Sequence, residues 1–397
     1  MTAPTDRAAT DRYRPCLRPG VLVSDALLLG PRTVHLVRNP RSGKSYEVGV
    51  KEHFLMARMD GTRGLDELGA QYAAEYGKRL GDANWRRLLG MLGARGLLEG
   101  GPEAAAVPEA AAVPAVTAVP AVTAVAGGPA APPAEEPPKP ARTLLRGTLP
   151  LVADADATAD RLHRAVGFLL AAPFMVPLLL LITAMEVLAV ARLGELVDGA
   201  VALFTNPVLL AGAATLLWFS TALHELAHGV VARRYGGQVA EIGLRWRLPV
   251  VIMYCTVDNY PYLPTRWQRV ATAAAGAVMN LAVLLPFCAV WLFAPVDDAT
   301  GEALAGLLLL GSAQALAMLV PFPPLDGYKI AAQLCGATGL ATSSREYVRL
   351  AVRRDPAAKA YPRRARTAYL GYTAGSLLVL AGIVAAVVAL AVHLVTT

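Results

Sequence analysis

The chain has 397 residues, of which 55% are hydrophobic and 17% charged, and its formal net charge is +7. Its mean hydropathy of +0.44 lies well away from that of a typical soluble domain and excludes an ordinary soluble enzyme. We therefore expect an integral membrane protein with a polar portion attached, in which the basic charge reports topology before any nucleic-acid binding.

The N-terminal part is polar. Residues 1–13 are predicted to be disordered, and the absence of a secretory signal there predicts that this end stays in the cytoplasm. Residues 14–99 have the composition of a small soluble domain. Extended stretches and a hairpin with Asn39–Gly43 turn chemistry come first, and three helical stretches follow. This order predicts a small α+β domain with a winged-helix-like plan.

Three stretches of this domain carry a family resemblance: Arg14–Val21, the hairpin end Tyr46–Gly49, and Met59–Leu68. They look like the PqqD-like domain, which serves as the precursor-peptide recognition element of many peptide-modifying systems. The resemblance implies that a leader peptide binds by adding a strand to the sheet edge. The alternative is a small winged domain that only packs against the membrane part or against a partner protein.

A linker is expected over residues 100–142. It is rich in Ala and Pro, and it contains a tandem Pro-Ala-Val-Thr-Ala-Val repeat that starts at Pro114 and again at Pro120. Proline at such intervals forbids a helix and favours an extended, flexible chain.

Residues 143–397 form the predicted membrane domain. A bilayer core needs about 20 apolar residues, and five stretches are long enough: 167–191, 208–232, 270–294, 303–321 and 368–394. Arginine concentrates before the first span, between the second and third, and between the fourth and fifth. This alternation predicts a multi-pass cell-membrane protein with its N-terminus in the cytoplasm and its C-terminus outside. The basic loops then face anionic lipid, and nucleic acid is not an expected partner.

The second span contains the pattern His224-Glu225-x-x-His228. On a helix the two histidines are one turn apart and share a face. They can bind one zinc ion, and Glu225 can take a proton from a zinc-bound water. Ionisable groups in a membrane-length segment are usually functional, although the same short pattern also occurs by chance in soluble helices.

A third ligand is expected at similar depth on another span. The stretch Val320–Gly327 follows the fourth span, and its three prolines break the helix. Broken backbone at membrane depth is tolerated only where it lines a cavity or is buried in protein. Asp326 placed there completes a His/His/Asp set and leaves zinc a fourth position for water. The alternative is that Asp326 only caps the next helix.

Together these residues resemble the site-2 protease family of intramembrane zinc metalloproteases (the M50 type). The resemblance extends to Ala275–Asn280, which stands where the family has a Gly-Pro-x-x-Asn element, although Ala277 replaces the proline. It implies one catalytic zinc ion on His224, His228 and Asp326, with Glu225 as the base, and it places Gly276 and Asn280 near the substrate backbone. Asn280 could equally join two helices by a hydrogen bond.

The loop Tyr254–Asn259 resembles the peptide zinc metalloprotease branch of this family, which often carries a PqqD-like N-terminal domain. We therefore expect a membrane-embedded zinc endopeptidase that matures a ribosomal precursor peptide, with an exporter or other peptide-modifying enzymes as partners. Two alternatives stay open: regulated intramembrane proteolysis of a membrane-anchored regulator, and a non-catalytic peptide-binding module that feeds an exporter. Residues 236–262 favour a hairpin that dips to the site over an ordinary loop.

Overall fold

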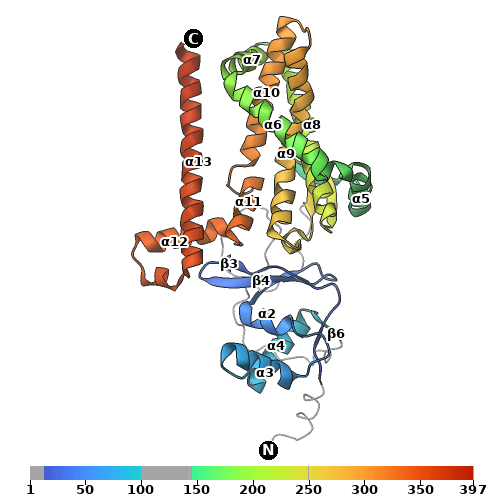
Figure 1. The fold of residues 1–397 in the computed structure, drawn as a ribbon, viewed down its shortest axis with the longest axis vertical. Helices are drawn as coiled ribbons and strands as arrows, with labels where there is room; N and C mark the ends of the chain where they lie inside the picture. The colour runs from blue at the N-terminus through green and yellow to red at the C-terminus, as the bar shows by residue number, and fades with distance from the viewer. Residues whose placement is uncertain (1–12, 100–142, 144, 249, 397) are drawn as a thin grey trace, which may run out of the picture. The chain divides into compact units, whose positions relative to one another are not determined.

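The computed structural model describes residues 13–99, 143, 145–248 and 250–396. The expectations for residues 1–12 and for the linker at 100–142 lie outside the described residues. The chain divides into two compact units, one formed by residues 1–123 with 336–366 and the other by residues 124–335 with 367–397 (Figure 1). Each unit is described by itself.

The first unit is a small sheet with helices beside it. Strand β4 is central, because β5 pairs along one edge while β2 and β3 pair in succession along the other. The predicted hairpin is confirmed as β4 and β5. The elements are β1 Cys16–Leu17, β2 Leu22–Val23, β3 Leu27–Leu29, β4 Arg32–Arg38, β5 Ser45–Gly49, α2 Val50–Met56, α3 Leu65–Tyr76, α4 Asp82–Ala94, β6 Leu98–Glu99, α12 Leu340–Val352 and η3 Pro356–Ala360.

The core of the first unit joins its sheet to its three early helices. Val37 from β4 is fully buried, as are Leu68 from α3 and Leu92 from α4. A small N-terminal unit that contains a sheet, attached to a mostly helical chain, agrees with the predicted fold class. The winged-helix-like plan stays a prediction.

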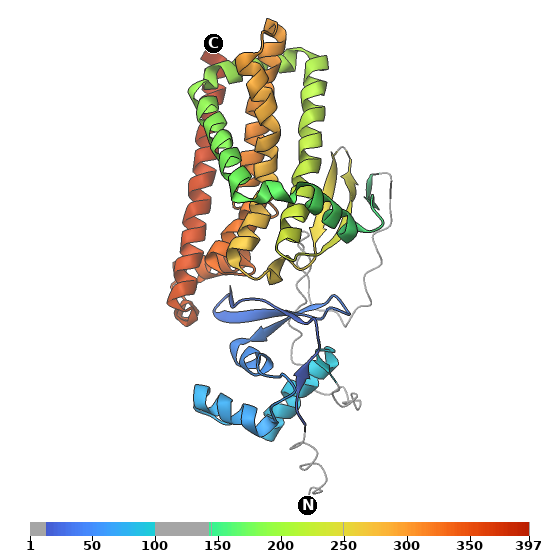
Figure 2. The ribbon, with the colours of Figure 1, turned by 45° about the vertical axis from the view of Figure 1, so that its right-hand side comes forward.

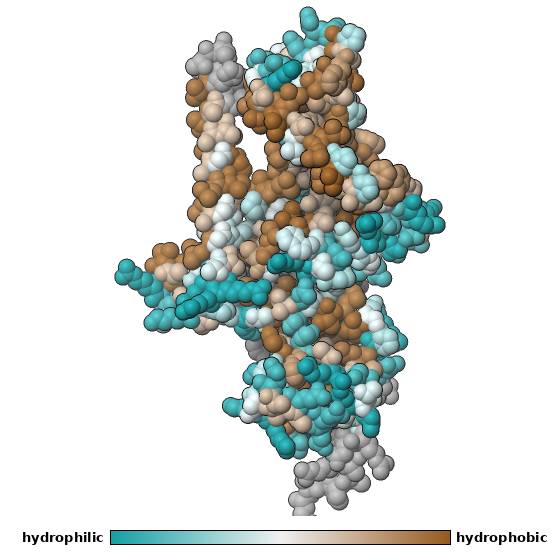
Figure 3. All heavy atoms as spheres, viewed as in Figure 1, coloured by the Kyte–Doolittle hydropathy of each residue, from teal (hydrophilic) through white to brown (hydrophobic). Residues whose placement is uncertain are grey.

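Among the described residues of the chain, five helices are long and apolar enough to cross a membrane. Their number confirms the predicted multi-pass arrangement, and Figure 3 shows the apolar residues that cover them. The helices are α6 Ala172–Ala191, α8 Pro207–Arg234, α9 Arg266–Phe293, α10 Asp298–Met318 and α13 Arg363–Thr396. The first begins later than expected, because residues 167–170 form a separate 3-10 turn, η1 Gly167–Leu170.

Several shorter elements of the second unit were not predicted. Helix α7, with only 13 residues, lies between the first two spans and packs against α10. This close packing depends on glycine, because a Cβ at Gly306 of α10 would lie 2.7 Å from the carbonyl oxygen of Gly199 of α7. The shorter elements are α5 Ala155–Val166, α7 Leu193–Thr205, η2 Tyr260–Tyr262 and α11 Asp326–Cys335.

A three-stranded sheet lies beside α8 (Figure 2). The predicted hairpin is confirmed as β8 Val239–Arg247 and β9 Val250–Val257. A third strand, β7 Arg146–Pro150, pairs with β8 and was not predicted. The order β7-β8-β9 leaves the outer edge of β9 without a strand partner among the described residues.

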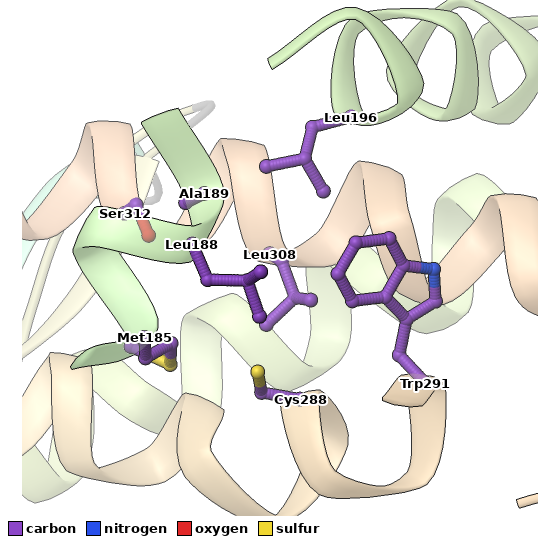
Figure 4. A pocket seen from close by; sticks show the side chains of 8 residues that line it. All are labelled: Met185, Leu188, Ala189, Leu196, Cys288, Trp291, Leu308 and Ser312. Atoms are coloured by element: carbon purple, nitrogen blue, oxygen red, sulfur yellow. The ribbon is translucent and has the colours of Figure 1, made fainter. Parts of the chain in front are cut away.

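The helices α6, α7, α9 and α10 share an apolar core. Figure 4 shows Leu188, Leu196, Cys288 and Trp291 around a small cavity of about 10 Å³ at their meeting point, close to the space of one water molecule. Next to this core, the Ser312 hydroxyl donates a 2.8 Å hydrogen bond to the Glu186 carboxylate. Glu186 is thus a partner of α10 within the bundle.

The contact between α7 and α10 gives a test of the fold. Alanine at Gly306 must fit against backbone atoms of Gly199, so we expect it to lower the free energy of unfolding by about 1–3 kcal/mol. Alanine at Gly301 of the same helix meets no atom closer than 3.9 Å, so we expect it to be neutral or to stabilise by up to about 1 kcal/mol through helix propensity. Thermal unfolding in detergent measures both, and equal midpoints for the two variants would contradict the close packing.

Candidate metal centre

Helix α8 carries the two histidines. Asn206 caps its first turn by accepting hydrogen bonds from Val208 and Leu209, and Arg233 and Arg234 occupy its last turn, where the helix dipole favours positive charge. His224 and His228 both point into the protein, with 3% and 7% of their surface exposed. The predicted sharing of one helix face is therefore observed.

Asp326 meets these two rings. Its Oδ2 lies 3.0 Å from Nε2 of His224 and 3.1 Å from Nε2 of His228, and the two Nε2 atoms are 3.2 Å apart. A tetrahedral ion with bonds of about 2.0 Å would hold its ligand atoms roughly 3.3 Å apart. The three atoms therefore have nearly the spacing of three corners of a zinc site.

The protonation of His228 supports a cation between these atoms. Its Nδ1 lies 2.6 Å from the carbonyl oxygen of Thr272 on α9, so Nδ1 carries the proton and donates it there. In the neutral ring the Nε2 lone pair then faces the lone pairs of Asp326 and His224 at about 3 Å. A metal ion satisfies all three acceptors at once, so the donor set fits the expected zinc.

The end of α10 and the start of α11 position Asp326. Between these helices the prolines interrupt the hydrogen-bond ladder, so Asp326 begins a new helix and is only 5% exposed. The next residue, Gly327, lies against the backbone of Leu319 and Val320, where a Cβ would collide.

Gly276 of α9 lies against the ring of His224, and a Cβ there would overlap the ring atoms Cε1 and Nε2. The Nδ1 atom of His224 is buried and has no hydrogen-bond partner among the described residues. On the Nδ1 side the ring has no polar restraint within this part of the chain, so packing against Gly276 restricts the ring in addition to the contacts of its Nε2. A role for Gly276 beside the substrate backbone stays a prediction.

Glu225 points toward the sheet. The backbone N–H of Cys255 in β9 donates a 3.1 Å hydrogen bond to its Oε2. Since this N–H points away from β8, it belongs to the outer edge of the sheet. Burial raises the pKa of the Cys255 thiol to about 12.

Asn280 is 2% exposed and joins two helices, because its Oδ1 accepts a 2.9 Å hydrogen bond from Ser220 of α8. Its Nδ2 is buried and has no partner within the described residues. The interhelical alternative is therefore observed, and a role for Asn280 beside the substrate backbone stays a prediction.

Three groups that support the ligand residues were not predicted from the sequence. Ser220 stands one turn before His224 on the same face of α8, and this spacing could have identified it. Lys329 donates a 2.8 Å hydrogen bond to Oδ1 of Asp326. It stands three residues after Asp326, and this helical spacing could also have identified it. Thr272 contributes only a backbone carbonyl, which no side-chain pattern can reveal.

The segment that carries the two histidines is similar to a known protein family. Residues 212–306 match the model of Peptidase family M50. This match indicates a membrane metalloprotease, and it covers His224, Glu225 and His228 but ends before Asp326. The third ligand therefore rests on the contacts described above. No curated protein and no solved structure gave a significant match.

Gly276 gives a test of the metal centre. We expect Gly276→Ala to displace the His224 ring and weaken metal binding on the order of 10–100-fold. Gly212→Ala on α8, where no atom lies within 4 Å of an added Cβ, is the matched control and keeps the metal. Zinc per chain is measured by mass spectrometry, and circular dichroism checks the fold. Full zinc occupancy in Gly276→Ala would refute this role of the glycine.

Proposed function

We propose that this chain is a membrane-embedded zinc endopeptidase. The observation that carries the proposal is the meeting of His224 Nε2, His228 Nε2 and Asp326 Oδ2 within 3.2 Å of one another, on a helix that also presents Glu225. The match to Peptidase family M50 over residues 212–306 supports the same class of enzyme. The His/His/Asp set leaves one position open, as catalytic zinc sites do.

The chemistry follows from the placement of these groups. A zinc ion held by the three ligands would lower the pKa of its bound water toward neutrality and polarise a peptide carbonyl. Glu225 then acts as general base, taking a proton from the attacking water and delivering it to the leaving amine. The Thr272 carbonyl keeps His228 in the tautomer that offers Nε2, and Lys329 balances part of the charge of Asp326.

The outer edge of β9 is the proposed seat of the substrate backbone. The N–H of Cys255 and the carbonyl of Val251 both point away from β8, because Glu225 and Trp218 are their partners. An extended peptide that pairs with this edge would run directly past Glu225. Pairing at Cys255 also takes the N–H that holds the Glu225 carboxylate, so the base is released as the substrate arrives.

The N-terminal unit is proposed to recognise a leader peptide in the PqqD-like manner, which makes the substrate a ribosomal precursor. Within this unit the edge of β3 already forms an isolated bridge, at Leu28, with the turn at residues 336–338. The Leu28 N–H donates to the carbonyl of Gly336 at 2.8 Å, and Thr338 donates to the Leu28 carbonyl at 2.9 Å. The edge is thus able to pair with a peptide, and a leader that used Leu28 would displace residues 336–338.

Regulated proteolysis of a membrane-anchored regulator would use the same chemistry, and the β3 edge favours a precursor peptide over it. A non-catalytic module has no physical need for Glu225 beside three ligand atoms. We further propose that the N-terminus is cytoplasmic and the C-terminus outside, which the placement of arginine supports. An exporter or other peptide-modifying enzymes are the proposed partners.

The role of Glu225 is tested by Glu225→Gln. The amide keeps an acceptor for the Cys255 N–H but cannot take a proton, so we expect full zinc content and a loss of cleavage of roughly 10²–10⁴-fold. Quenched fluorescent peptides, with products identified by mass spectrometry, measure the rate in nanodiscs. Glu195→Gln, in an exposed part of α7, is the matched control. If Glu225→Gln still cleaves the peptide, Glu225 is not the base. If purified wild-type protein contains no zinc, the proposed function is wrong.

A further inference from the structure

The sheet beside α8 gathers positive charge on one face. Its register places Arg146 of β7 opposite Arg247 of β8, and Thr148 opposite Arg245. Alternate residues of a strand point to the same side, so the three guanidinium groups share a face. We call Arg146, Arg245 and Arg247 the arginine face.

No carboxylate neutralises this face within the described part of the chain. All three arginines are exposed, and none takes part in a salt bridge there. Glu241, on the same side of β8, lies four residues from Arg245, roughly 13 Å along the strand. Like charges opposite each other destabilise a sheet, so the folded protein bears a cost that an anionic partner would remove.

The arginine face lies far from either end of α8. Trp218 of α8 donates a 2.7 Å hydrogen bond to the carbonyl of Val251, and Val251 pairs with Trp246, between Arg245 and Arg247. Roughly 24 Å of helix separate Trp218 from Arg234, and the 28-residue helix is about 42 Å long. A helix α8 that spans a bilayer core of about 30 Å would carry this level inside the core. These three arginines, unlike Arg233 and Arg234, would then not belong to the cytoplasmic charge that indicates topology. Charged groups at such depth face water or a ligand and mark functional sites.

The same sheet carries the edge beside Glu225. Arg245 lies over the ring of Tyr254, with its Cζ 4.8 Å from the ring centroid. Tyr254 belongs to β9, and its ring lies close to Gly243 of β8, so Arg245 covers the face of the β8–β9 pair. A peptide strand added there would lie about 4.8 Å beyond β9 and therefore roughly 10 Å from β8. An extended arginine and an acidic side chain that point toward each other can bridge this distance.

We propose that the arginine face binds acidic side chains of the peptide substrate and thereby selects a substrate with Asp or Glu near the cleaved bond. Lipid phosphates offer the same charge, but in a bilayer that α8 spans the headgroups would lie near the ends of this helix and not at the level of Trp218. The inference rests on the proposed function, because it assumes that a peptide occupies the edge of β9.

The test uses the full chain with Glu225→Gln in phosphatidylcholine nanodiscs, so that binding is measured without cleavage. The probes are a fluorescein-labelled Asp-containing extended peptide and its Asn-for-Asp analogue, and anisotropy gives both Kd values. We expect the Asp peptide to bind about tenfold or more tightly than the analogue, with a difference that falls as salt rises. Arg245→Gln with Arg247→Gln should abolish the difference, whereas Arg245→Lys alone should keep much of it. Arg345→Gln, an exposed arginine of α12, is the control and should keep all of it.

Equal affinity for the two peptides, no binding of the Asp peptide at about millimolar concentration, or a preference that survives the double substitution would overturn the proposal. If the double substitution instead removes binding of phosphatidylglycerol added to the nanodiscs and leaves the peptide preference intact, the face binds lipid and the proposal is wrong. Wild-type protein separates the two hypotheses. If the wild type cleaves both peptides with equal kcat/KM, the proposed protease function holds and the proposed role of the arginine face is wrong. If the Asp peptide binds more tightly but neither peptide is cleaved, only the proposed protease function is wrong.

Discussion

Two imidazole nitrogens and a carboxylate oxygen converge within 3.2 Å in a buried part of the second unit, and each offers a lone pair to the same space. Such atoms repel one another unless a cation or a proton lies between them. The surrounding structure works against that repulsion. Thr272 fixes the ring of His228, Gly276 leaves room for the ring of His224, and the broken helix before Asp326 delivers its carboxylate to them. A metal ion bound between them would turn this unfavourable arrangement into a bonded site.

The candidate metal centre was largely predictable because its three ligand atoms belong to side chains whose types and spacing are visible in the sequence. Two histidines one turn apart on an apolar helix, and a carboxylate after a proline-broken span, define a set that the fold needs only to bring together. The five spans and the β8–β9 hairpin were predictable for a related reason, since hydropathy and β-branched or aromatic residues between turns leave a local signal.

What could not be predicted depends on partners distant in sequence. Strand β7 is short, and it forms a strand because β8 offers it an edge across some 90 residues of chain. Helix α7 is too short to span and has no distinctive pattern, yet Gly199 and Gly306 allow it to lie against α10. The same holds for residues 336–338, whose pairing with Leu28 joins two ends of the chain's sequence. The local secondary-structure propensity of a segment gives no information about such contacts.

One hydrogen bond connects the proposed base, Glu225, to the proposed substrate edge of β9. Glu225 accepts from the N–H of Cys255, and this is the donor that an added strand would use at the same position of β9. Both contacts cannot exist at once, because the strand carries a single N–H at Cys255. The Cys255 N–H holds the Glu225 carboxylate against the sheet, and a peptide at this edge would free the carboxylate to turn toward the ligand atoms of α8. Occupancy of the edge and availability of the base are then two results of one exchange of hydrogen-bond partners, which would restrict proton transfer to the moment when a peptide backbone lies beside the metal centre.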